Sequence, residues 1–82
     1  MSKIIQLKCW PTFYEAVVKG YKKFEIRKDD KDYKIGDIVV LMEFDSEIEE
    51  FTGRIHSFKI TYVLRNCEEF GLMKNYCIIG FK

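Results

Sequence analysis

Gly20-Tyr21-Lys22-Lys23-Phe24-Glu25-Ile26-Arg27 is the stretch in which a short helix ends and a charged strand begins. Because side chains alternate along a strand, Phe24 and Ile26 are predicted to share one face. Three charged side chains are predicted on the other face, namely Lys23, Glu25 and Arg27. We expect the apolar face to anchor the strand in a core. The charged face is then held on a rigid element, where a polar or anionic ligand could bind.

A short helix is predicted just before this strand. Pro11 suits the first helical position, and Thr12 with Glu15 fits a capping box, in which each side chain bonds a free backbone N–H. Gly20 is expected to end the helix. Three apolar residues recur at helical spacing on one face: Phe13, Ala16 and Val17. A helix this short does not persist alone, so we expect it to dock on a sheet.

Strands are predicted at residues 3–9, 23–28, 38–44, 55–64 and 76–81, with a short strand or turn at 51–54. One face of the strand at 55–64 is predicted to carry Phe58, Ile60, Tyr62 and Leu64. One helix cannot supply the crossovers of a parallel sheet, so the sheet should be mainly antiparallel or mixed. Five to six apolar strands at short spacing favour a barrel, which has no exposed edges. The expected fold is α+β and β-rich, in a single domain covering residues 1–82.

The cysteines are Cys9, Cys67 and Cys77, an odd number without a CxxC pair, and the chain has one histidine, His56. This pattern disfavours a disulfide framework and a zinc site, and no metal or cofactor is expected. Cys9 and Cys77 lie in apolar runs and are predicted to be core residues. A reducing, cytoplasmic location is the expectation, with no signal peptide and no membrane-spanning segment.

Charge is unevenly distributed along a chain whose formal net charge is +1. Residues 19–34 contain seven basic and four acidic side chains, whereas residues 43–50 contain five acidic side chains and no basic one. A basic region of this kind attracts phosphates or carboxylates. Two solvated loops of opposite sign are the alternative explanation.

The motif Gly20-x-Lys22-x-x-Glu25-x-Arg27 follows a short helix, and Gly36-Asp37 precedes an apolar strand. In this order of elements the chain resembles the ASCH superfamily of PUA-like domains, and especially the small uncharacterised PUA-like proteins of bacteria and phages. The resemblance implies a pseudobarrel of five to six mostly antiparallel strands, with the helix beside a cleft that binds RNA or a nucleotide. It further implies that Lys22 and Arg27 contact phosphate or base, and that Glu25 orients Arg27 or accepts from a base amino group.

The candidate ligand-binding residues are Tyr14, Tyr21, Lys22, Lys23, Glu25 and Arg27. Asp29 and Asp30 are expected to border the cleft. Aromatic side chains that stay exposed beside the motif could stack on a base. Core packing is the favoured interpretation of Trp10 and Phe13, whereas Tyr14 and Tyr21 remain open between the two roles.

Two other classes of function stay open. One branch of the ASCH superfamily resembles this chain at Lys22 and consists of amidohydrolases that act on an acylated nucleoside, with a threonine nucleophile. Glu25 occupies the position of that threonine here, so this chain departs from the branch at the nucleophile. The candidate catalytic residues are Lys22 and Glu25. A Cys67–His56 pair is disfavoured. The second class is a protein-interaction module that uses the acidic residues 43–50. The sequence leaves the oligomeric state open.

Overall fold

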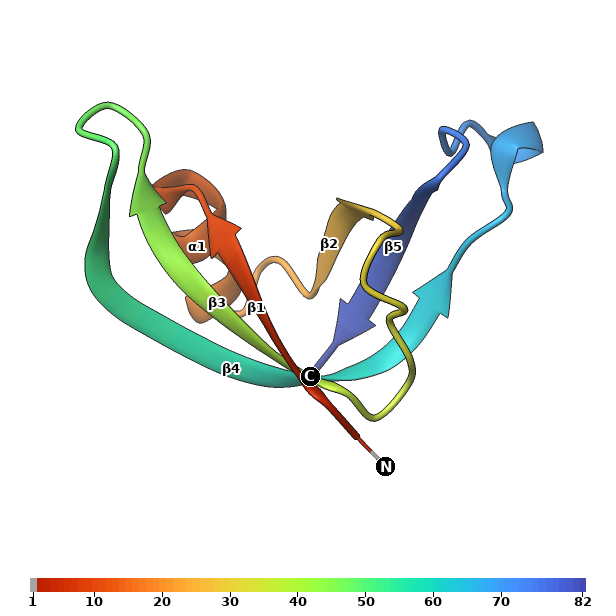
Figure 1. Cartoon of the computed structure of the whole chain (residues 1–82), viewed down its shortest axis with the longest axis horizontal. Helices are drawn as coiled ribbons and strands as arrows, with labels where there is room; N and C mark the ends of the chain where they lie inside the picture. The colour runs from red at the N-terminus through yellow and green to blue at the C-terminus, as the bar shows by residue number, and fades with distance from the viewer. Residues whose placement is uncertain (1) are drawn as a thin grey trace.

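Five strands form one mixed, open sheet in the computed structural model, which describes residues 2–82 (Figure 1). The elements are β1 (Ile4–Cys9), α1 (Pro11–Val18), β2 (Phe24–Lys28), β3 (Ile38–Asp45), β4 (Glu50–Leu64), a short 3₁₀ helix η1 (Glu68–Phe70) and β5 (Tyr76–Phe81). The strand order is β1-β3-β4-β5-β2, in which β1 and β3 are parallel and the other neighbours antiparallel. The predictions of a β-rich α+β fold, a mixed sheet and one early α-helix are confirmed.

The sheet does not close into a barrel, because β1 and β2 remain its two edges. Figure 1 shows a V-shaped molecule, with β1, β3 and α1 in one arm and β2 and β5 in the other. The long strand β4 runs through both arms and joins them. The separate short strand or turn predicted at 51–54 is wrong, since these residues belong to β4. The helix α1 lies in the same arm as β3 and packs against that strand.

A β-bulge in β4 changes the face of its second half. One extra residue of β4, Thr61, lies between Ile60 and Tyr62, while their partners on β5, Phe81 and Gly80, are adjacent. The extra residue reverses the side-chain alternation beyond it. Ile60 is therefore buried, whereas Tyr62 is exposed and Val63 packs against the core. The single face predicted for residues 58–64 is wrong for this reason.

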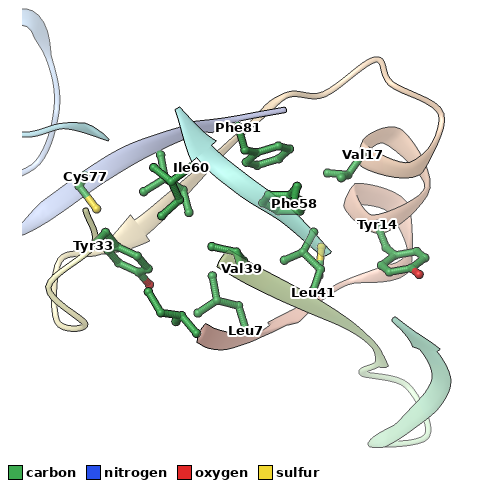
Figure 2. Packing of buried hydrophobic residues seen from close by; sticks show 13 residues of the cluster. Leu7, Tyr14, Val17, Tyr33, Val39, Leu41, Phe58, Ile60, Cys77 and Phe81 are labelled. Atoms are coloured by element: carbon green, nitrogen blue, oxygen red, sulfur yellow. The ribbon is translucent and has the colours of Figure 1, made fainter. Parts of the chain in front are cut away.

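The core lies between the sheet and α1, and it extends to the loop after β2 (Figure 2). Its buried apolar residues are Ile5, Leu7, Cys9, Tyr14, Val17, Tyr33, Val39, Leu41, Phe58, Ile60, Cys77, Ile79 and Phe81. The predicted burial of Cys9 and Cys77 is confirmed. Every strand except β2 contributes an apolar side chain to this set. The edge strand β2 is thus held by its pairing with β5 and by polar contacts.

The helix α1 begins at Pro11 as predicted, but its N-terminus has no side-chain cap. The capping box is wrong because the Glu15 carboxylate instead accepts a hydrogen bond from Arg54 Nη1 at 2.6 Å. The apolar face also differs, since Tyr14 and Val17 are buried while Phe13 is 46% exposed. No helix within residues 2–82 is long and apolar enough to cross a membrane.

Candidate functional site

A pocket of about 650 Å³ lies between β1, the start of α1 and β2. Four aromatic side chains line it: Trp10, Phe13, Phe24 and Phe44. Four charged residues line it as well, namely Lys8, Lys22, Glu25 and Arg27, and Cys9 and Ile26 complete the lining. A volume of this size matches the range of small-molecule and cofactor sites. Residues from both arms of the V meet here.

The faces of β2 are reversed relative to the sequence prediction. Phe24 and Ile26 are 45% and 57% exposed, whereas Glu25 between them is 5% exposed. The apolar side chains of β2 therefore line the pocket and do not anchor the strand in the core. A buried carboxylate is costly unless charged partners and hydrogen bonds compensate it. The partners of Glu25 are the two cations of the motif.

Lys22 contacts one oxygen of the Glu25 carboxylate, and Arg27 contacts the other. Lys22 Nζ forms an ion pair with Glu25 Oε1 and donates to the Phe24 carbonyl at 2.8 Å. Arg27 donates to Glu25 Oε2 from Nε at 3.1 Å and from Nη2 at 3.0 Å. Arg27 Nη2 also donates to the Lys8 carbonyl of β1 at 2.6 Å. The structure thus brings Lys22, Glu25 and Arg27 together on one concave surface.

This cluster keeps hydrogen-bonding capacity for a ligand. Within residues 2–82, the contacts above use three of the five N–H groups of Arg27 and two of the three of Lys22. They also use three of the four lone-pair positions of the Glu25 carboxylate. The charged lining, with Lys8 included, carries three cations and one carboxylate. The pocket can therefore accept one hydrogen bond at Glu25 and donate several around it, in a net positive field.

Aromatic rings form the walls of the pocket. The rings of Trp10 and Phe13 are nearly parallel, at 13°, with centroids 6.1 Å apart, and both side chains are about half exposed. The core role favoured for these two residues is wrong, because both are absent from the buried core and line the pocket. Lys22 Nζ lies 5.3 Å from the Phe13 ring centroid and 5.1 Å from that of Phe24. Lys8 Nζ lies 4.5 Å from the Phe44 ring centroid.

The other candidate residues lie elsewhere. Tyr14 is 3% exposed and packs in the core, with the Arg54 guanidinium 4.9 Å from its ring centroid. Burial raises the pKa of the Tyr14 hydroxyl. Tyr21 is 84% exposed and lies outside the pocket lining, as does the exposed Lys23.

Asp29 and Asp30 do not border this pocket. They line a second concavity with Asp32 and Arg65. Arg65 donates to the Asp29 carboxylate from Nε at 2.7 Å and from Nη2 at 3.2 Å. This contact fixes the loop after β2 to the end of β4. Residues 2–82 contain no cluster of three or more metal-ligating side chains.

Nucleophilic groups are scarce in the pocket. Its lining, drawn from residues 2–82, contains no serine or threonine. Cys9 lines it, but burial raises the pKa of the Cys9 thiol to about 11, so little of it is thiolate near neutral pH. Cys67 is a half-exposed free thiol in the loop before η1, and His56 is exposed on β4.

Sequence reasoning missed Lys8, Phe24 and Phe44 as pocket residues. Lys8 is the last outward-facing residue of β1, and Phe44 lies near the end of β3 beside it. A sequence signal was available only for Lys8, which is the one charged residue of β1. Phe44 reaches the pocket because the pairing of β3 with β1 brings it beside Lys8, which the sequence alone does not show.

Comparison with known proteins places this β-rich domain in a class without an assigned activity. The chain belongs to the family described as a domain of unknown function, DUF3850, whose model matches residues 4–81. A curated relative is the uncharacterized 12.9 kDa protein in the GpA 3' region of Escherichia phage P2. It is 36% identical over 63 residues, which are 77% of this chain and 56% of that protein. The chain therefore matches little more than half the length of this phage relative.

Proposed function

We propose that this chain is a PUA-like domain that binds single-stranded RNA or a nucleotide, with one base held in the pocket. Two features support the likeness to PUA-like domains. The motif from Gly20 to Arg27 follows a short helix, and Gly36-Asp37 leads into the apolar strand β3. The three free cysteines fit the proposal that the protein acts in the reducing cytoplasm.

The observation that carries the proposal is the Glu25 carboxylate, which lines a pocket with four aromatic side chains. It is buried and held from both oxygens, with one lone-pair position left. An N–H group on the edge of a base would bond that position. Because the carboxylate repels phosphate, the ligand's base and not its backbone would approach Glu25.

The aromatic walls supply stacking surfaces for a base. Trp10 and Phe13 present near-parallel, half-exposed rings, and Phe24 faces the same space. Each base stacked on an aromatic side chain contributes about 1–3 kcal/mol to binding, with little dependence on sequence. Stacking and one carboxylate contact together suit an unpaired base.

The cations around the walls supply phosphate contacts. Lys8 is an exposed residue of the pocket lining, and the two N–H groups of Arg27 Nη1 take no part in the hydrogen bonds that hold Glu25. Phosphate contacts release counterions, so the affinity should fall as the salt concentration rises. The pocket's positive charge is therefore the salt-sensitive part of the proposed interaction.

Nothing in the pocket favours the two other classes over binding. The amidohydrolase mechanism needs a nucleophile beside Lys22, and the lining within residues 2–82 offers no hydroxyl. The acidic segment 43–50 is partly internal, since Glu43 is 5% exposed and accepts from Thr52 Oγ1 at 2.7 Å. The amidohydrolase and the protein-interaction module are the alternatives that stay open if no RNA or nucleotide binds.

Trp10 is the sole tryptophan of the chain, so its fluorescence reports on the pocket. We would titrate the protein with a single-stranded RNA of about eight nucleotides, a length within the site sizes of small binding domains, and with nucleoside monophosphates. The expected result is a saturable change in fluorescence with salt-dependent affinity. Phe13→Ala should weaken binding by about 1–3 kcal/mol. Lys8→Gln should reduce the salt slope by about 1.

Lys59→Gln is the matched control for Lys8→Gln, because Lys59 is an exposed lysine of β4 outside the pocket. It should leave both affinity and salt slope unchanged. A fluorescence signal that never saturates would reject the proposal. Equal effects of Lys8→Gln and Lys59→Gln would reject the pocket as the site and leave only nonspecific attraction.

A further inference from the structure

The pocket lies between the two edge strands of the sheet, β1 and β2, and we call the space between these strands the seam. β1 and β2 are edge strands, and neither has a second strand partner within residues 2–82. The hydrogen bond that joins them in this part of the chain runs from Arg27 Nη2 to the Lys8 carbonyl. Figure 1 shows β1 and β2 on opposite sides of the opening of the V. Edge strands carry main-chain N–H and C=O groups that are free for another partner.

The main-chain direction on β2 follows from its contacts with β5. The Lys23 carbonyl accepts from Phe81 N at 3.1 Å, and Asp29 N donates to the Asn75 carbonyl at 2.7 Å. Both groups belong to odd-numbered residues that face β5. Successive residues of a strand alternate in direction, so the N–H and C=O groups of Phe24 and Ile26 face the seam. The hydrogen bond from Lys22 Nζ to the Phe24 carbonyl agrees with this assignment.

The same argument assigns the directions on β1. The Lys3 carbonyl accepts from Ile38 N of β3 at 2.9 Å. Alternation then turns the main-chain groups of Gln6 and Lys8 away from β3, toward the seam. The contact of the Lys8 carbonyl with Arg27 agrees. Side-chain contacts thus occupy the Phe24 and Lys8 carbonyls, while Ile26 has no such contact among residues 2–82.

We propose that the main-chain N–H and C=O of Ile26 bond the Watson–Crick edge of the base in the pocket. This inference rests on the proposed function and deepens it. One residue on a free strand edge offers a donor and an acceptor side by side, and the Watson–Crick edge of each base offers the complement. The Ile26 side chain lines the pocket, so its main chain lies at the pocket wall.

This contact restricts the ligand to unpaired bases. A base in a duplex already uses its Watson–Crick edge, so it cannot bond the edge of β2. The side chain of residue 26 contributes no hydrogen bond, which explains how an isoleucine can serve at a polar contact. The preference for unpaired bases then depends on main-chain groups, which a side-chain substitution does not remove.

Amide hydrogen exchange of the full, ¹⁵N-labelled chain tests the inference. In the free protein, Ile26 N–H should exchange faster than the N–H groups of Glu25 and Arg27, which face β5. A saturating single-stranded RNA of about eight nucleotides should slow exchange at Ile26 by about tenfold or more, the equivalent of a hydrogen bond of about 1.4 kcal/mol. The same RNA annealed to its complement should leave Ile26 exchange unchanged.

The outcomes separate the two proposals. If Trp10 fluorescence saturates with the single strand and Ile26 exchange does not slow, the main-chain contact is overturned and the proposed function stands. If fluorescence shows no binding, both are overturned. Slowed exchange at Ile26 with the duplex would also overturn the inference, because the Watson–Crick edges of a duplex are already paired and cannot bond Ile26.

An amide-to-ester replacement at residue 26 gives a second test. It keeps the isoleucine side chain and removes one N–H, which should weaken single-strand binding about three- to tenfold. The same replacement at Ile48, an exposed residue of the β3–β4 turn outside the pocket lining, is the control and should leave the affinity unchanged. The melting temperature of each variant shows whether it is folded. Folded ester protein with unchanged affinity would overturn the inference.

Discussion

Glu25 determines the orientation of β2. A strand with Phe24 and Ile26 on one side would ordinarily bury that side. Here the apolar side chains of the core come from the other four strands, α1 and Tyr33. The buried side chain of β2 is the Glu25 carboxylate, which has two cationic partners. Lys22 and Arg27 compensate the buried charge of Glu25, so this side of β2 can face inward. The apolar side chains of β2 then face the other way and line the pocket.

At the residue scale, the hydrogen bonds of the Asp37 carboxylate lead us to predict that the folded protein is less stable in acid. Its carboxylate accepts from Lys3 Nζ at 2.7 Å, Lys3 N at 3.1 Å and Lys34 N at 3.0 Å, which ties the starts of β1 and β3 together. The hydrogen bond from the Lys3 side chain is the largest cause that lowers the pKa of Asp37 below its ordinary 3.8. A lowered pKa contributes stability above the unfolded-state value, and this contribution is lost as pH falls through the folded-state value.

Asp37→Asn should therefore lower the free energy of unfolding by about 1–2 kcal/mol at neutral pH, through the loss of charged hydrogen bonds. The difference from the original protein should shrink below about pH 4. Urea denaturation at pH 7 and pH 3 measures it. Glu47→Gln, at an exposed acid in the β3–β4 turn, is the control and should change little at either pH. A difference that stays constant with pH would contradict the assigned cause.

At the element scale, the C-terminal turn of α1 delivers the chain to the pocket. Gly20 has a φ of +81°, and Tyr21 N and Lys22 N both donate to the Ala16 carbonyl, at 2.9 and 3.0 Å. A left-handed residue at this place turns the chain sharply away from the helix. The turn places Lys22 beside Glu25, so the helix end and the site are structurally coupled.

Gly20→Ala should destabilise the protein by about 1 kcal/mol, because a Cβ strains the left-handed backbone although no heavy atom lies within 4 Å of it. Gly80→Ala is the matched control. Its backbone is not left-handed, and its new Cβ meets Thr61 Oγ1 at an ordinary 3.8 Å. The control should stay within about 0.5 kcal/mol of the original. Equal losses for both variants in urea denaturation would show that backbone strain at Gly20 is not the cause.

At the scale of the whole molecule, the three thiols report on the integrity of the fold. Burial raises the pKa of Cys77, as of Cys9, to about 11, and both side chains are within the core. Cys67 is half exposed in a loop. A thiol reagent should modify Cys67 quickly, because its loop lets the reagent reach the side chain, and the other two only as fast as the protein unfolds.

Cys67→Ser should abolish the fast phase and leave the slow phase unchanged. In concentrated urea all three thiols of the original chain should react together. Reaction of Cys9 in the fast phase would show that the interior beneath the pocket opens locally, since Cys9 lines that pocket. Mass spectrometry of the modified peptides assigns each phase.

The sequence by itself determined the elements. Alternation and turn residues located all five strands to within a few residues, apart from the start of β4, and Pro11 and Gly20 bounded the helix. These signals are local, because backbone geometry depends on neighbouring residues. The pairing of Glu25 with Arg27 on one face was likewise predictable from alternation, which however placed Lys23 beside them where the structure has Lys22.

Only the tertiary structure decided which faces are buried and what completes the pocket. The bulge near Thr61 reversed the end of β4, and the open sheet brought Lys8 and Phe44 to the motif. Trp10 and Phe13 became pocket walls because the core was already filled by other elements. Burial depends on competition among all apolar side chains for one small interior, and no local pattern records the outcome of that competition.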